Sequence, residues 1–173
     1  NLLIDPLKLK EIIIALIFKA LIRTVIGLVT EIILTAPLFG VSILNLGFPL
    51  LLLFLSLYIF GITLGLFVSA GLIRFGPSFE NIAWSSLFLL APLGCIYYPI
   101  EILPNFFQIV AKGLPLVYIF DETRNILLNG FVNYENLKLA YILNLIYLTF
   151  GIILFYFSFL KARVKGTLIN MGE

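Results

Sequence analysis

The sequence predicts an all-α polytopic membrane protein with four transmembrane helices and an outer re-entrant pair of short helices before the last of them. Two observations predict this class. The 173 residues are 62% hydrophobic and only 12% charged, whereas soluble domains carry about 25% charged residues. The apolar residues also form long stretches that proline, glycine and charged residues separate. Since lipid cannot satisfy an open sheet edge, we expect helices in one transmembrane domain over residues 1–173.

Four segments approach the length of about 20 apolar residues that a membrane crossing needs: residues 12–34, 48–73, 82–98 and 137–160. The third segment is short and contains Pro92, which removes a backbone donor and predicts a kink. On the second, Gly61, Gly65 and Ser69 have a small-residue spacing that lets another helix approach closely. Packing inside the chain and contact between two copies are both open interpretations of this spacing.

A charged stripe runs along the first expected span. Lys19, Arg23, Gly27 and Glu31 recur every four residues and therefore share one face of a helix. Three charges near a helix centre cost roughly 8–10 kcal/mol on the insertion scale, so this face should contact other helices or a wet path. In one alternative, Lys19 and Glu31 extend toward the two membrane surfaces and only Arg23 lies deep. Direct contact with a substrate is the other.

The basic residues predict the orientation. One side of the expected membrane holds six of them: Lys8, Lys10, Arg74, Lys161, Arg163 and Lys165. The other side holds three: Lys112, Arg124 and Lys138. We therefore expect a multi-pass protein of the plasma or inner membrane with both ends in the cytoplasm.

Residues 99–130 are predicted to form the re-entrant hairpin. Residues 104–113 and 115–130 each begin with proline and end with glycine, which is typical of short helices. Outside the membrane, these helices would leave many apolar side chains in water: Phe106, Phe107, Ile109, Val110, Leu116, Val117, Ile119 and Phe120. An amphipathic cap on the membrane surface is the alternative. Asp121 and Arg124 are three residues apart and can pair across one turn, or be solvated at the surface.

Several function classes are excluded by residue type. The chain has one cysteine, Cys95, and no histidine, so it lacks an internal disulfide, imidazole bases and the usual metal ligands. We expect no catalytic, metal or cofactor site and no enzymatic activity in this chain. The sequence has no phosphate-binding G-x-x-x-x-G-K-[ST] motif, so any ATP would bind to another subunit. The net charge of +2 does not indicate a nucleic-acid partner.

The run LFLLAPLGCIYYPIEILPNFFQIVAKGLPLVYIFDETRNILLNG, residues 87–130, resembles the signature stretch of the ABC type-2 exporter permeases. In that family an aromatic turn is followed by P-x-E-x-L-P, an amphipathic helix, an L-P break and an Arg-bearing helix that ends in glycine. The matching positions are Pro99, Glu101, Leu103, Pro104, Leu114, Pro115, Arg124 and Gly130. Residues 2–14 and 161–173 are similar to the family's entry to its third helix and its basic tail.

The resemblance implies a permease subunit that pairs with a second copy or a related chain and docks on a nucleotide-binding ATPase. It would export an amphiphilic drug, lipid or glycan. The hairpin would close the exit of the path, with Tyr98 beside the family positions. Family members have six spans, so the sequence is expected to lack the first two. The alternatives are a non-ABC membrane transporter or a membrane scaffold without transport activity.

Overall fold

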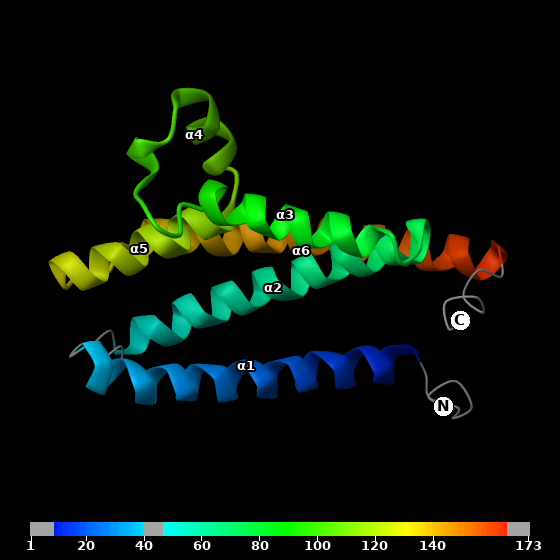
Figure 1. Ribbon diagram of the computed structural model, residues 1–173, viewed down its shortest axis with the longest axis horizontal. Helices are drawn as coiled ribbons and strands as arrows, with labels where there is room; N and C mark the ends of the chain where they lie inside the picture. The colour runs from blue at the N-terminus through cyan, green and yellow to red at the C-terminus, as the bar shows by residue number, and fades with distance from the viewer. Residues whose placement is uncertain (1–8, 40–46, 166–173) are drawn as a thin grey trace. The chain divides into compact units, whose positions relative to one another are not determined.

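The computed structural model describes residues 9–39 and 47–165, which are all-helical with short connections (Figure 1). The elements are α1 (Leu9–Phe39), α2 (Phe48–Phe75), α3 (Phe79–Leu93), the short 3₁₀ helix η2 (Ile100–Ile102), α4 (Asn105–Ala111), α5 (Pro115–Asn129) and α6 (Tyr134–Lys165). The chain divides into two compact units, Asn1–Leu50 and Leu51–Glu173. The first unit contains α1, and the second contains nearly all of the remaining helical structure.

Two of the described helices are long and apolar enough to cross a membrane, α2 and the segment Tyr134–Arg163 of α6. Four such spans were expected. Helix α1 covers the first expected span and has 31 residues, a rise of about 46 Å. Helix α3 has only 15 residues and rises about 22 Å, less than the ~30 Å hydrocarbon core of a bilayer.

The prediction that residues 82–98 form one kinked helix was wrong, because α3 ends at Leu93. Pro92 lies next to the last residue of the helix, so the helix terminates there and has no continuation beyond a kink. Gly94 follows as the C-cap, and its N–H donates to the carbonyl oxygen of Leu90 at 2.7 Å. Proline has no backbone N–H to donate. Glycine has no side chain, so other parts of the chain can pack closely against the end of the helix.

Polar contacts join α2 to α6 in the second unit. The Asn144 Nδ2 group donates to both the backbone oxygen and the Oγ of Ser56, each at 2.9 Å. Tyr141 donates its hydroxyl hydrogen to the carbonyl oxygen of Leu52 at 2.8 Å. Near the other end, a Cβ built at Gly151 would lie 3.5 Å from the Leu66 side chain. The two helices are therefore held together by buried hydrogen bonds and by a small residue that allows close approach.

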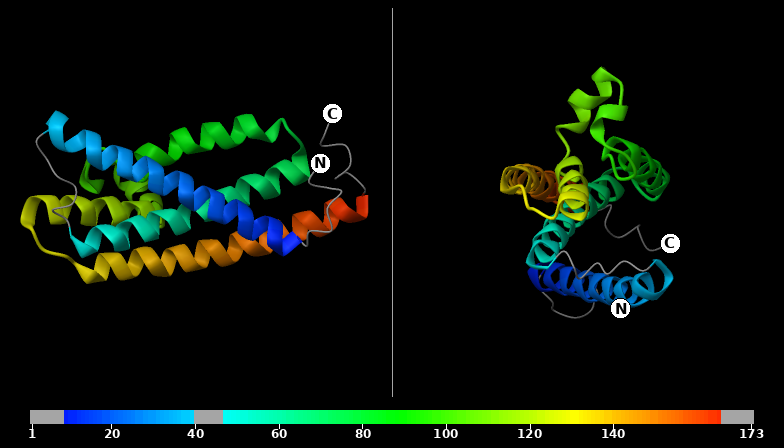
Figure 2. Two further views of the ribbon diagram at one scale, coloured as in Figure 1. Left: turned by 90° about the horizontal axis from the view of Figure 1, so that it is seen from below. Right: turned by 90° about the vertical axis from the view of Figure 1, so that its left-hand side faces the viewer.

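Within the second unit, α2 and α6 run in the same direction and α3 runs opposite to them, as the colours in Figures 1 and 2 show. The C-terminal ends of α2 and α6 consequently lie at the same end of this unit. Arg74 is in the last turn of α2, and Lys161 and Arg163 are near the end of α6. Helix α4 stands apart from the long helices (Figure 2).

The pair of short helices predicted within residues 99–130 is confirmed as α4 and α5. Their surroundings differ. Helix α5 packs along α6 and buries Leu116, Val117 and Ile119, so the expectation that these side chains would need lipid to cover them was wrong. The apolar side chains of α4 do remain exposed, with Phe106 at 71% and Ile109 at 75%.

Candidate functional site

The first candidate site is the hairpin segment, which in the structure covers residues 94–133 and so extends the predicted range 99–130 at both ends. It joins α3 to α6 through η2, α4 and α5. Proline begins both of its α-helices, as predicted. Pro104 is the N-cap of α4, and Pro115 is the first residue of α5. Gly130 ends α5 in the left-handed conformation, with φ at 73° and its N–H donating to Ile126. The sequence therefore sets the hairpin's turns by backbone constraints that proline and glycine supply.

Arg124 of α5 forms a hydrogen bond to the turn that follows α3. Its Nη1 donates to the carbonyl oxygen of Cys95 at 2.8 Å. Its Nη2 lies 3.7 Å from Oδ1 of Asp121, one turn earlier, which confirms the predicted pair. Because α3 stops at Leu93, the Cys95 carbonyl lies beyond the helix, and the guanidinium supplies a donor for it.

Glu122 connects α5 to the start of α6. Its side chain is only 1% exposed, and its Oε1 accepts a hydrogen bond from the backbone N–H of Asn133 at 2.6 Å. The Asn133 Oδ1 in turn accepts from the N–H of Glu135 at 3.1 Å. A carboxylate at a helix N-terminus is favoured by the unpaired N–H groups and the helix dipole there. The second oxygen of Glu122, Oε2, is buried without a hydrogen-bond partner among the described atoms.

Sequence reasoning missed the role of Glu122, although a signal was present. Pro115, Ile119 and Glu122 follow one another at helical spacing on one face of α5, and all three are buried. An acidic residue on the apolar face of a short helix needs a partner, and the start of the next helix lies within reach. Asn136, in the first turns of α6, also donates to Asp121 Oδ2 at 3.3 Å.

The remaining hairpin residues that the resemblance singled out do not converge on one cavity. Tyr98 donates its hydroxyl hydrogen back to the carbonyl oxygen of Pro92 at 2.8 Å. Pro99 is the N-cap of η2, and the Glu101 side chain is exposed. Tyr147 of α6 donates to the carbonyl oxygen of Gly113 at 3.1 Å. These contacts brace the hairpin against α3 and α6, and they leave Glu101 facing outward.

Cys95 lies at the centre of the hairpin's small apolar core with Ala111 and Val117. The side chain has no exposed surface, and the backbone has a φ of 53°, which is uncommon for a residue other than glycine. The thiol is therefore out of contact with solvent.

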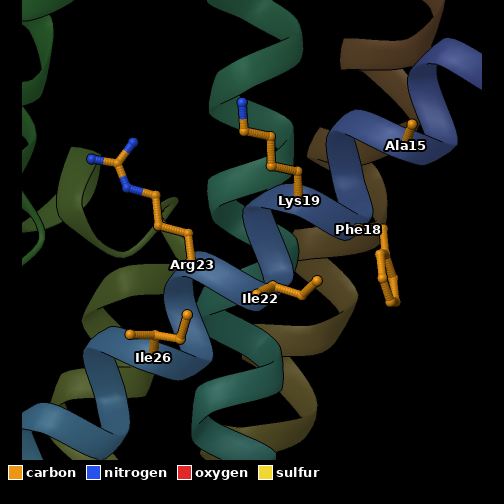
Figure 3. Close-up of a pocket in the computed structure, with 6 residues that line it drawn as sticks. All are labelled: Ala15, Phe18, Lys19, Ile22, Arg23 and Ile26. Atoms are coloured by element: carbon orange, nitrogen blue, oxygen red, sulfur yellow. The ribbon is translucent and has the colours of Figure 1, made fainter.

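The second candidate site is the charged face of α1, defined by Lys19 and Arg23. Both side chains are exposed and extend to the same side of the helix in Figure 3. They border a shallow depression lined also by apolar side chains: Ala15, Phe18, Ile22 and Ile26. Neither cation forms a salt bridge within the part of the chain that the structure describes. Glu31 is in α1, but its side chain lies outside the described set.

Among the described residues, no other helix packs closely against the two glycines of the small-residue spacing on α2. A Cβ built at Gly61 or at Gly65 would meet nothing within 4 Å among the described atoms, and Ser69 is half-buried. The close approach between α2 and α6 occurs elsewhere, at Gly151. Packing of α6 against α2 therefore gives no reason for glycine at positions 61 and 65.

No family model, no curated protein and no solved structure matches this chain. In the described residues, no group of three or more His, Cys, Asp or Glu side chains is placed to hold a metal ion.

Proposed function

We propose that this chain is the transmembrane permease subunit of an ATP-driven ABC exporter that moves an amphiphilic substrate out of the cytoplasm. The observation that carries the proposal is the hairpin. Two short helices with proline starts are tied to α3 by Arg124 and to α6 by Glu122, in the segment whose sequence resembles the exporter permeases. ATP hydrolysis belongs to a separate nucleotide-binding subunit, and the permease pairs with a second copy or a related chain.

In this proposal α1, α2, α3 and α6 cross the plasma or inner membrane, and both ends of the chain are cytoplasmic. The basic C-terminal ends of α2 and α6 lie at one end of the second unit. The positive-inside rule assigns this end to the cytoplasm. The hairpin then belongs to the outer side, where the exposed apolar side chains of α4 enter the outer leaflet.

The short helix α3 is compatible with a crossing because of the turn that follows it. Irregular backbone at membrane depth is tolerated where protein covers it and supplies its hydrogen bonds. Gly94 and Cys95 are both buried, and Arg124 donates to the Cys95 carbonyl oxygen. The turn and the hairpin therefore extend α3 toward the outer surface without exposing unpaired backbone to lipid.

The test is export and ATP hydrolysis in one reconstituted complex. The chain is co-expressed with a candidate P-loop ATPase from the same organism, and the pair is reconstituted in proteoliposomes with a fluorescent amphiphile. We expect ATP-dependent export that is lost when the P-loop lysine of the ATPase is replaced. Failure of the two proteins to associate, or export without ATP, would contradict the proposal and favour a non-ABC transporter or a scaffold.

A double proline variant tests whether the hairpin acts as an exit gate. Pro104→Ala with Pro115→Ala removes both helix starts, since proline fixes φ near −65°. We expect ATP hydrolysis to persist while export falls at least five-fold. Pro77→Ala, in the exposed turn between α2 and α3, is the matched control and should export normally. Unchanged export by the double variant would show a passive cap.

A further inference from the structure

The charged face of α1 has no acidic residue within one turn of either cation. Lys19 and Arg23 are one turn apart and exposed. The acidic residues of α1 are Glu11, eight residues before Lys19, and Glu31, eight residues after Arg23. This is a separation of about 12 Å along the helix axis, whereas neighbouring side chains on one helix are three or four residues apart.

The other long helices have no acidic residue near their middles. Helix α2 contains neither aspartate nor glutamate. The acidic residues of α3 and α6 are Glu80 and Glu135, each in a first turn. In the hairpin, Glu122 caps α6 and Asp121 contacts Arg124 and Asn136. The described carboxylates of α3 and α6 thus lie at helix starts, whereas Arg23 lies near the midpoint of α1.

The side chains around the two cations are apolar. Ala15, Phe18, Ile22 and Ile26 line the same depression as Lys19 and Arg23 (Figure 3). A guanidinium offers a planar fork of donors that fits phosphate or carboxylate oxygens, and a lysine one turn away adds a second charge. Charged groups inside a membrane must be paired or hydrated. The combination favours an anionic headgroup joined to an apolar chain.

We propose that α1 binds an anionic amphiphile, with the headgroup between Lys19 and Arg23 and the apolar chain along Ile22 and Ile26. The inference rests on the proposed function in placing α1 in the bilayer, and it limits the ligand of this site to amphiphiles with a phosphate or carboxylate group. A resident bilayer lipid and a transported molecule share this chemistry.

The test measures binding of dodecyl phosphate to the purified 173-residue chain in neutral detergent. The zwitterionic dodecylphosphocholine is the comparison ligand. We expect the double variant Lys19→Gln/Arg23→Gln to weaken dodecyl phosphate binding at least ten-fold. Lys161→Gln/Arg163→Gln removes two positive charges from the end of α6 and should change binding less than two-fold. Lys19→Arg/Arg23→Lys keeps both charges and should bind within three-fold of the wild type.

Three results would overturn the inference: no binding to the wild type, equal loss in the α6 control, or equal affinity for the zwitterion. Size-exclusion profiles and the charge-preserving variant separate a folding defect from a lost site. Competition by phosphatidylglycerol indicates a resident lipid as the ligand, and its failure to compete excludes that lipid; both results support the site. Binding is measured without an ATPase, so loss of binding contradicts this inference alone, and loss of ATP-dependent export contradicts only the proposed function.

Discussion

Arg124 and Arg23 both interrupt apolar helices, yet their surroundings differ. Arg124 is half-buried, donates to the Cys95 carbonyl oxygen at 2.8 Å and lies near Asp121. Arg23 is exposed, and no salt bridge in the described residues includes it. A charge whose partners lie in its own chain is explained by the fold. Arg23 has no acidic residue within one turn on α1, and a charge in a membrane segment must be paired or hydrated.

The difference extends to the acidic residues. Glu122 and Asp121 bind the start of α6 through Asn133 and Asn136, so both carboxylates contact polar groups of their own unit. Lys19 and Arg23 form no salt bridge within the described residues. We therefore expect the hairpin charges to contribute to stability and the α1 charges to contribute to binding.

The largest effect on stability is expected from Glu122→Ala. The change leaves the Asn133 N–H without its acceptor and opens a cavity where a fully buried side chain lay. We expect a loss of about 3 kcal/mol in the free energy of unfolding. Glu122→Gln keeps an acceptor oxygen and should remain within about 1 kcal/mol of the wild type. Thermal unfolding is followed with a maleimide dye that fluoresces on reaction with Cys95, the single cysteine. Equal stability of the alanine variant would show that the contact is dispensable.

Gly94→Ala tests the close approach of the hairpin to α3. A Cβ there would lie 2.9 Å from both the Leu116 side chain and the Leu90 carbonyl oxygen. We expect a loss of about 1–3 kcal/mol, because overpacking forces neighbouring atoms to move. Gly61→Ala with Gly65→Ala is the control, since a Cβ at either position meets nothing within 4 Å. The control should unfold at the wild-type temperature, and a large loss there would show that another helix covers these glycines.

Arg124→Gln and Arg23→Gln test the comparison directly. Arg124→Gln removes a charged donor to the Cys95 carbonyl oxygen, and we expect a loss of about 1–2 kcal/mol. Arg23→Gln removes no described contact and should leave the unfolding temperature unchanged. The thiol-reactive dye again reports unfolding. Equal destabilisation by both variants would remove the distinction between the two arginines.

The smallest effect concerns the reactivity of Cys95 in the folded chain. Because the thiol is fully buried, we expect labelling at pH 7.5 at least 100-fold slower than in the unfolded chain. Fast labelling of the folded protein would contradict the burial.

Much of the helical layout was predictable because local signals determine it. Pro104, Pro115 and Gly130 fix the starts and the end of the short helices, and the Asp121–Arg124 pair follows from spacing within one helix. The end of α3 was not predicted, because an apolar sequence around Pro92 is equally consistent with a kink. Termination depends on Gly94 and on the Arg124 donor, which lies far along the chain.

Contacts between helices were also missed. Asn144 is fully buried against Ser56, and Gly151 allows the close approach of α2 and α6. An asparagine inside an apolar helix indicates a polar partner, but the sequence does not specify which helix supplies it. Gly61 and Gly65 have the small-residue spacing of helix contacts, but a Cβ at either position meets no described atom within 4 Å.

In the proposed topology, α3 crosses the membrane and places the hairpin opposite the basic helix ends. Ser78 precedes α3, Lys112 lies in the hairpin, and both side chains are exposed. Single cysteines at these positions, in a chain with Cys95→Ser, are labelled in intact cells with a membrane-impermeant maleimide. We expect Lys112→Cys to react from outside and Ser78→Cys to react only after the membrane is permeabilised. Labelling of both positions from the same side would contradict this topology.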